Sequence, residues 1–178
     1  MERCTKAMKD ILSSSNEWED ELRFYPLEGL LPVDQALSVN TTYLVVALIA
    51  RKSANGNPIR LQKLLTGPQM RLLLPLLQSP HYCPHQVLYA GLFCSYRGLL
   101  AGLFSTDNMA TQEWVATLEE SRIRMQHAHE LGNWKKELKQ LYNTISELRI
   151  KLRPFGLGIV ISVTESAYTL VSLPVLLP

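Results

Sequence analysis

The amino-acid sequence predicts one domain of the α+β class, in which antiparallel strands come first, helices follow and a β-hairpin closes the chain. Three observations favour this fold. Asn55-Gly56 separates two strand-like segments, Thr66 begins a capped helix, and large aliphatic residues recur every three or four positions over residues 138–152. The chain has 178 residues, of which 47% are hydrophobic, and this is enough apolar material for a folded core.

The N-terminal third of the chain is expected to be mostly β-structure. Residues 1–21 are polar and mixed in charge, and we expect them to form a short helix or a loose arm. Asn55-Gly56 tolerates positive φ at both positions, which predicts a hairpin turn with residues 58–61 as the strand that follows it. The strands expected before this turn share apolar and β-branched residues, and they are residues 22–27, 30–37 and 43–50.

Two helices are expected next. The Thr66 side chain can accept from the Gln69 amide, and the Gln69 side chain can reach back, so a helix is predicted over 67–78. Pro75 lies inside this segment and should kink it or make it irregular. After a short strand at Tyr82-Cys83, a second helix is expected to begin near Pro84 and to continue through Phe93.

The middle of the chain gives weaker signals. Residues 98–104 are apolar and contain two glycines, and no element is assigned to them; residues 105–108 are expected to be a loop or a cap. Residues 112–131 have a helical pattern in which Trp114, Leu118 and Met125 lie along one side. Gly132-Asn133 should end that helix.

The clearest helix covers residues 138–152. Its apolar side is formed by five residues spaced three or four apart, namely Leu138, Leu141, Ile145, Leu148 and Leu152. We expect Ile145 and Leu148 to be buried and Lys139 and Arg149 to be exposed. Pro154 and Gly156 should end the helix, and residues 159–163 and 168–172 should form the closing hairpin.

Three segments in this order resemble the winged-helix effector domain of the OmpR/PhoB-type response regulators. Residues 55–61 (NGNPIRL) and 65–73 (LTGPQMRLL) resemble the family's entry into its first helix. Residues 144–154 (TISELRIKLRP) resemble its recognition helix, and residues 161–170 (ISVTESAYTL) resemble its wing. The resemblance covers residues 22–172 apart from an insertion, and it predicts a winged-helix domain over 22–174, with 97–137 inserted and 175–178 as a tail.

The resemblance implies a DNA-binding transcriptional regulator. Helix 138–153 would enter a major groove, and the wing at 159–170 would lie on the DNA backbone. The positions that match DNA-facing or neighbouring family positions are Lys139, Thr144, Ser146, Arg149, Lys151, Ser162, Thr164 and Tyr168. The alternative for the charged positions is an ordinary solvated helix face, and for Tyr168 the preferred alternative is packing on the core.

The chain also departs from the family. A receiver domain is not expected, and the connection before the recognition helix is enlarged. Ser146 and Glu147 replace residues that are commonly basic in the family, and Thr164, Glu165 and Ala167 stand where the family has Arg, Gly and Gly. These changes remove charge that would bind phosphate. A second hypothesis is therefore a protein-interaction module, or a subunit of a larger nucleoprotein assembly, with reduced DNA binding.

The inserted segment is the candidate partner-binding element. In the family this connection is where some members contact RNA polymerase, so residues 97–137 are a candidate site for RNA polymerase or another protein, through Trp114 and Leu118. The alternative is that the insertion packs on its own domain. A homodimer also stays open.

Composition and motifs indicate no enzyme and no cofactor. His81, Cys83 and His85 have metal-ligand types, but a fourth ligand is not evident, and no phosphate loop or catalytic motif is present. The net charge of +2 is too small to indicate a particular class of binding partner. The three cysteines favour a reducing compartment. Because the apolar runs are too short to span a bilayer, we expect a cytoplasmic protein that does not enter a membrane.

Overall fold

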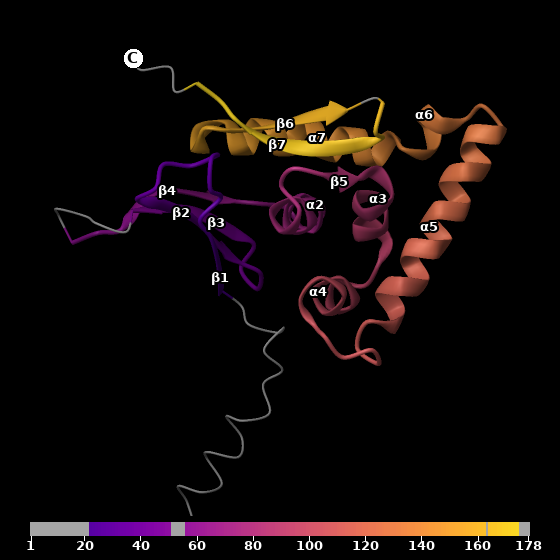
Figure 1. Cartoon of the computed structure of the whole chain (residues 1–178), viewed down its shortest axis with the longest axis horizontal. Helices are drawn as coiled ribbons and strands as arrows, with labels where there is room; N and C mark the ends of the chain where they lie inside the picture. The colour runs from indigo at the N-terminus through magenta and orange to yellow at the C-terminus, as the bar shows by residue number, and fades with distance from the viewer. Residues whose placement is uncertain (1–21, 51–55, 163, 175–178) are drawn as a thin grey trace, which may run out of the picture.

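The computed structural model describes residues 22–50, 56–162 and 164–174, and it has an α+β fold. The expected N-terminal arm and C-terminal tail lie outside the described residues. The first four strands are β1 (Leu22–Tyr25), β2 (Gln35–Asn40), β3 (Val45–Ala50) and β4 (Ile59–Leu64). They form an antiparallel sheet in the order β1-β2-β3-β4 at one end of the molecule (Figure 1).

The strand expected over residues 30–37 is present as β2, but its predicted bounds are wrong. The strand begins at Gln35, because the chain before it turns instead of extending. Leu27 and Gly29 have positive φ values of 47° and 78°, and the amides of Leu30 and Leu31 both donate to the Leu27 carbonyl. This turn contains leucines because it packs on the core, where Leu27 and Leu31 are buried.

The second turn of the sheet also shortens an expected strand. The Asn40 side-chain oxygen accepts from the amides of Thr42 and Tyr43 at 3.0 and 2.8 Å, and Leu44 has a φ of 56°. Because of this local turn, β3 begins at Val45 and not at residue 43 as expected. β3 and β4 pair as the predicted hairpin, with a register shift between Leu48 and Ile49. Asn55 of the predicted turn lies outside the described residues.

Helix α2 (Gly67–Gln78) is confirmed at both ends. The Thr66 hydroxyl accepts from the Gln69 amide at 3.4 Å, and the Thr66 amide donates to the Gln69 side chain at 3.0 Å, so the predicted capping box forms. Pro75 lies inside the helix, which continues beyond it to Gln78. Gly91 packs against α2 there, since a Cβ at Gly91 would lie 3.0 Å from the Arg71 carbonyl oxygen.

The middle of the chain is helical. A short strand, β5 (Cys83–Pro84), precedes α3 (His85–Phe93), and α5 (Gln112–Glu130) and α6 (Trp134–Glu137) follow later. Helix α4 (Tyr96–Phe104) has no counterpart in the sequence-based prediction, because its glycines lower helix propensity. Gly102 is explained by packing: a Cβ there would lie 2.0 Å from the Trp114 ring.

The C-terminal part follows the prediction closely. Helix α7 (Lys139–Leu152) continues into a short 3₁₀ turn, η2 (Arg153–Phe155), and Gly156 ends it with a φ of 72°. Strands β6 (Leu157–Ser162) and β7 (Ala167–Ser172) then form the hairpin. With β5 they make a three-stranded sheet in the order β5-β7-β6, which lies beside α7 (Figure 1).

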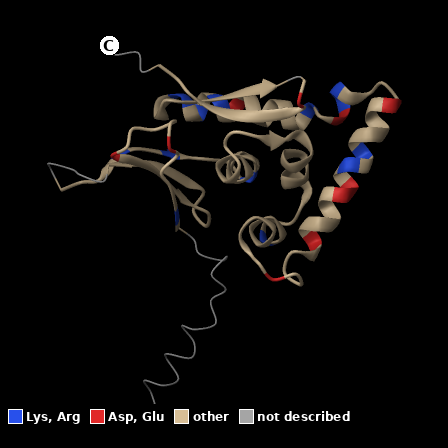
Figure 2. Cartoon of the chain, in the orientation of Figure 1, with Lys and Arg blue, Asp and Glu red and all other residues tan. Residues whose placement is uncertain are grey.

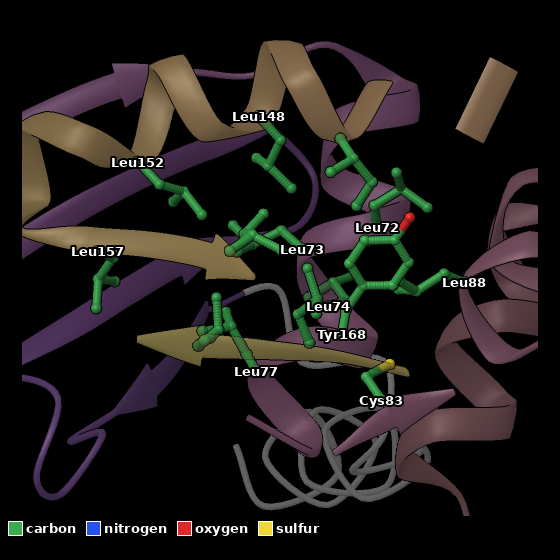
Figure 3. Packing of buried hydrophobic residues seen from close by; sticks show 14 of the residues in the cluster. Leu72, Leu73, Leu74, Leu77, Cys83, Leu88, Leu148, Leu152, Leu157 and Tyr168 are labelled. Carbon is green, nitrogen blue, oxygen red and sulfur yellow. The ribbon is translucent and has the colours of Figure 1, made fainter. Parts of the chain in front are cut away.

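Helices α2 and α7 and the hairpin meet in the main core. Ile145 and Leu148 are 1% and 0% exposed, so their predicted burial is confirmed. Figure 3 shows Leu148 and Leu152 pointing from α7 toward Leu73 of α2, with Leu157 of β6 nearby. This packing orients α7, so the side of the helix opposite the apolar residues faces outward.

Candidate functional site

The outward side of α7 is polar and lies beside the hairpin. Its exposed residues are Lys139, Gln140, Asn143, Ser146, Glu147, Ile150 and Arg153. The buried stripe fixes the rotation of the helix, and the hairpin turn exposes Thr164 and Glu165. The outward side of α7 and the hairpin turn are therefore both exposed to solvent.

The positive charge of the chain is concentrated on α6 and α7 (Figure 2). Residues 134–153 hold six basic residues and two acidic ones, whereas the whole chain holds eighteen and sixteen. The remainder of the chain therefore has more acidic than basic residues. The six basic residues are Lys135, Lys136, Lys139, Arg149, Lys151 and Arg153. Such a local excess produces a positive surface potential that the net charge of the chain hides.

Glu137, one of the two acidic residues, is engaged in helix packing. Its carboxylate accepts from the Tyr89 hydroxyl, and from the Arg124 guanidinium at 2.8 Å. The hydrogen bond from Tyr89 lowers the pKa of the Glu137 carboxyl, and the charge of Arg124 lowers it further. The ion pair joins α5 to α6, so Glu137 is already balanced by a cation outside the basic segment.

Lys136 and Lys139 line a polar hollow of about 710 Å³. Its walls come from the start of α2 at Thr66, from Arg124 of α5 and from the outward side of α7 at Asn143. Lysine ammonium groups and amide side chains line the hollow, together with the carboxylates of Glu137 and Glu147. Ammonium groups and amides bind phosphate oxygens and base edges, respectively.

Arg149 is not exposed as predicted, and this expectation is wrong. The side chain is half-buried, and its Nε donates to the Ile159 carbonyl at 2.8 Å. β6 is an edge strand, so its outward carbonyls lack a neighbouring strand, and Arg149 satisfies one of them. Lys151 is held in a similar way, with its ammonium 3.3 Å from the Leu64 carbonyl. Both residues join α7 to a strand.

Arg149→Ala is expected to lower the free energy of unfolding by about 1–2 kcal/mol, because a hydrogen bond from a charged donor is lost and the hairpin loses its link to α7. Urea unfolding followed by circular dichroism measures this change. Arg153→Ala is the matched control, since Arg153 is exposed on the same helix end and should change stability by less than about 0.5 kcal/mol. Equal losses in the two variants would contradict this role of Arg149.

Some of the other predicted DNA-facing residues are buried and some are exposed. Thr144 and Tyr168 are 6% and 1% exposed, so neither belongs to the outward surface. Tyr168 packs on the core against His85, with ring centroids 4.7 Å apart, and burial raises the pKa of its hydroxyl to about 12. Ser146 is exposed, although its hydroxyl donates to the Tyr142 carbonyl.

The hairpin turn presents neutral and acidic groups. The hydroxyls of Ser162 and Thr164 are 3.3 Å apart and form a hydrogen bond with each other. Thr164 and Glu165 are exposed, and Ser162 is half-buried. Sequence reasoning did not select Lys135, Lys136 or Gln140 as candidates, although a charge count restricted to residues 134–153 points to the two lysines.

The inserted segment packs on its own domain. Trp114 is 7% exposed and belongs to a small cluster with Ala90, Cys94 and Leu99, so the indole is not available to a partner in this structure. Leu118 is half-buried, and its carbonyl accepts from the Gln86 side chain at 2.9 Å. Helix α5 therefore completes the core on the side of α3 and α4.

The cysteine and histidine motif lies at β5. Cys83 is fully buried, and burial raises the pKa of its thiol to about 12. A thiol with such a pKa is almost entirely protonated at neutral pH and is a poor nucleophile or metal ligand. Among the described residues, no group of three or more histidine, cysteine, aspartate or glutamate side chains is placed to hold a metal ion.

Comparison of the chain with protein-family models, with curated proteins and with solved structures gave no match in any of the three. Over the part of the chain that the structure describes, none of the helices is long and apolar enough to cross a membrane. Functional inference therefore depends on the geometry and charge described above.

Proposed function

We propose that the chain is a winged-helix DNA-binding protein that regulates transcription. The observation that carries this proposal is the basic segment 134–153, in which four basic side chains on α6, α7 and η2 are exposed and α7 packs beside the β6–β7 hairpin; the four are Lys135, Lys136, Lys139 and Arg153. The order of α2, β5, α3, α7, β6 and β7, together with the β5-β7-β6 sheet, supports a winged helix with an insertion between α3 and α7. In this arrangement α7 is the recognition helix and the hairpin is the wing.

The outward side of α7 has suitable chemistry for a major groove. The groove is wide enough for an α-helix, and amide side chains such as those of Gln140 and Asn143 can make paired hydrogen bonds to adenine. Lys136 on α6 and Lys139 at the start of α7 are suited to phosphate contacts that fix the position of the helix. Arg149 and Lys151 act mainly by holding α7 against β6 and β4. Recognition would therefore depend on the N-terminal half of α7.

The alternative hypothesis is a protein-interaction module, or a subunit of a nucleoprotein assembly. The acidic Glu165 in the hairpin turn and Glu147 on α7 favour weak DNA binding, because each would repel phosphate. The Glu147 carboxylate accepts a hydrogen bond from the Gln69 side chain at 3.2 Å and keeps its negative charge. A chain that binds no duplex at low salt would support the alternative.

Glu165→Arg is expected to tighten binding to mixed-sequence duplex DNA severalfold at low salt and to steepen the salt dependence of log K by about one, because the change replaces a repelled carboxylate with a phosphate-binding cation. Fluorescence anisotropy of a labelled duplex over a salt series measures both quantities. Glu28→Arg makes the same charge change on the β1–β2 turn, away from the hairpin. If the two variants tighten binding equally, the hairpin is not a DNA contact.

A further inference from the structure

A second, mostly apolar cavity of about 620 Å³ lies on the side of the molecule that carries α5. Its walls come from the start of α3, from α5, from Trp134 of α6 and from the hairpin turn at Glu165. The volume lies within the range of small-molecule sites, which are usually apolar with a few polar groups. Glu165 and Ser166 of the hairpin turn line this cavity, whereas Lys136 and Lys139 do not.

Aromatic side chains dominate one part of the cavity wall. The Trp134 ring lies 6.4 Å from the His85 ring and 6.1 Å from the His129 ring, measured between centroids. The Trp134 Nε1 donates to the Tyr142 hydroxyl at 3.0 Å, which fixes the indole in position. Met125 adds a polarisable side chain to the same wall. The cavity therefore has a rigid aromatic wall instead of mobile surface groups.

His85 is a buried polar residue that the fold does not satisfy. Its side chain lines the cavity, the residue is only 5% exposed, and its Nδ1 has no hydrogen-bond partner among the described residues. The unpaired Nδ1 is itself buried, so His85 contributes its ring to the cavity wall and not a hydrogen-bonding group for a ligand.

The charge at the cavity is negative. Glu130 and Glu165 both line it. Arg122 also lines it, but two of its nitrogens donate to the Glu119 carboxylate at 2.7 and 3.0 Å, so its charge is already paired. Carboxylates beside an aromatic wall attract cations and repel anions.

We infer that this cavity binds a small organic cation that carries an apolar body, such as an arylalkyl or alkyl ammonium compound. The ammonium group would lie near the Trp134 ring and the two carboxylates, because an aromatic face and a carboxylate both stabilise a cation. The apolar body would fill the space beside Met125. The site shares the hairpin turn at Glu165 and Ser166 with the proposed wing, but it is tested on the chain without DNA, so a failure of this inference is distinguishable from a failure of DNA binding.

Isothermal titration calorimetry of the full chain with benzyltrimethylammonium tests this inference, and phenylacetate serves as an anion of similar size. We expect benzyltrimethylammonium to bind one site per chain, and phenylacetate to bind at least about tenfold more weakly. Equal affinities for the two compounds, or no binding of benzyltrimethylammonium at millimolar concentration, would overturn the proposal.

Two variants locate the site. Trp134→Leu should weaken benzyltrimethylammonium binding about tenfold, since the cation–π contact is lost. Glu165→Gln should weaken it severalfold without touching the core, because Glu165 is exposed, whereas Glu28→Gln, a matched change outside the cavity, should leave the affinity unchanged. Thermal melts confirm that each variant is folded. Unchanged affinity in both cavity variants would show that the compound binds elsewhere and would refute the site.

Discussion

Ile145→Asp is expected to abolish cooperative folding or to leave an aggregated protein. Ile145 is 1% exposed and lies in the middle of the α7 stripe. Removing its side chain costs about 2–5 kcal/mol, and a buried carboxylate without a partner adds further cost. That sum approaches the whole stability of an ordinary domain, which is about 5–15 kcal/mol. Circular dichroism during thermal and urea unfolding measures the effect.

Ser146→Asp is the matched control for this prediction. Ser146 is the next residue on the same helix, but it is exposed, so the same new carboxylate stays in water. We expect a change below about 0.5 kcal/mol in the free energy of unfolding. An unchanged melting temperature for Ile145→Asp, or equal destabilisation of both variants, would show that this side of α7 does not face the core.

The double change Lys136→Gln and Lys139→Gln is expected to weaken binding to mixed-sequence duplex DNA by at least about tenfold at 0.1 M salt. If both side chains hold phosphates, the slope of log K against log salt should become shallower by nearly two, because each phosphate contact contributes about 0.9. Both lysines are exposed at the surface, so the fold should tolerate the change. Anisotropy with a labelled duplex gives the affinity and the slope together.

Arg60→Gln with Arg122→Gln is the matched control, because it removes the same net charge from β4 and α5. Arg122 forms an exposed ion pair with Glu119 at 2.7 Å, and loss of such a pair changes stability little. A general charge effect would weaken DNA binding equally in the two double variants. A specific surface on α6 and α7 requires the lysine variant to lose much more affinity.

The sequence predicted an element correctly where the pattern of neighbouring residues matches the packing of that element in the folded chain. The α7 stripe is periodic because one side packs on α2, and the Thr66 cap depends only on neighbouring residues. The strand expected over residues 30–37 begins only at Gln35, because the leucines before it pack on the core from a turn. Helix α4 was missed because Gly102, unfavourable in an isolated helix, makes room for the Trp114 ring.

The candidate site was predictable in outline but not in its details. Composition and pattern placed a polar, partly basic side on residues 138–153, and Lys139 lies on it as an exposed residue. Core packing of Tyr168, the alternative that the sequence favoured, is confirmed. The role of Arg149 depends on an edge carbonyl of β6, and the burial of Thr144 depends on how α7 packs. Such contacts join residues that are distant in sequence, so one sequence without a structure does not reveal them.

The salt dependence of duplex DNA binding by the unmodified chain tests the central claim most directly. Anisotropy of a labelled mixed-sequence duplex, measured between about 50 and 200 mM salt, should show binding that weakens as salt rises, with a slope of log K against log salt of about −3 or steeper. Such a slope corresponds to three or more phosphates held by the basic segment 134–153. Absence of binding at about 50 mM salt for every duplex tested, or binding that salt does not weaken, would contradict the account.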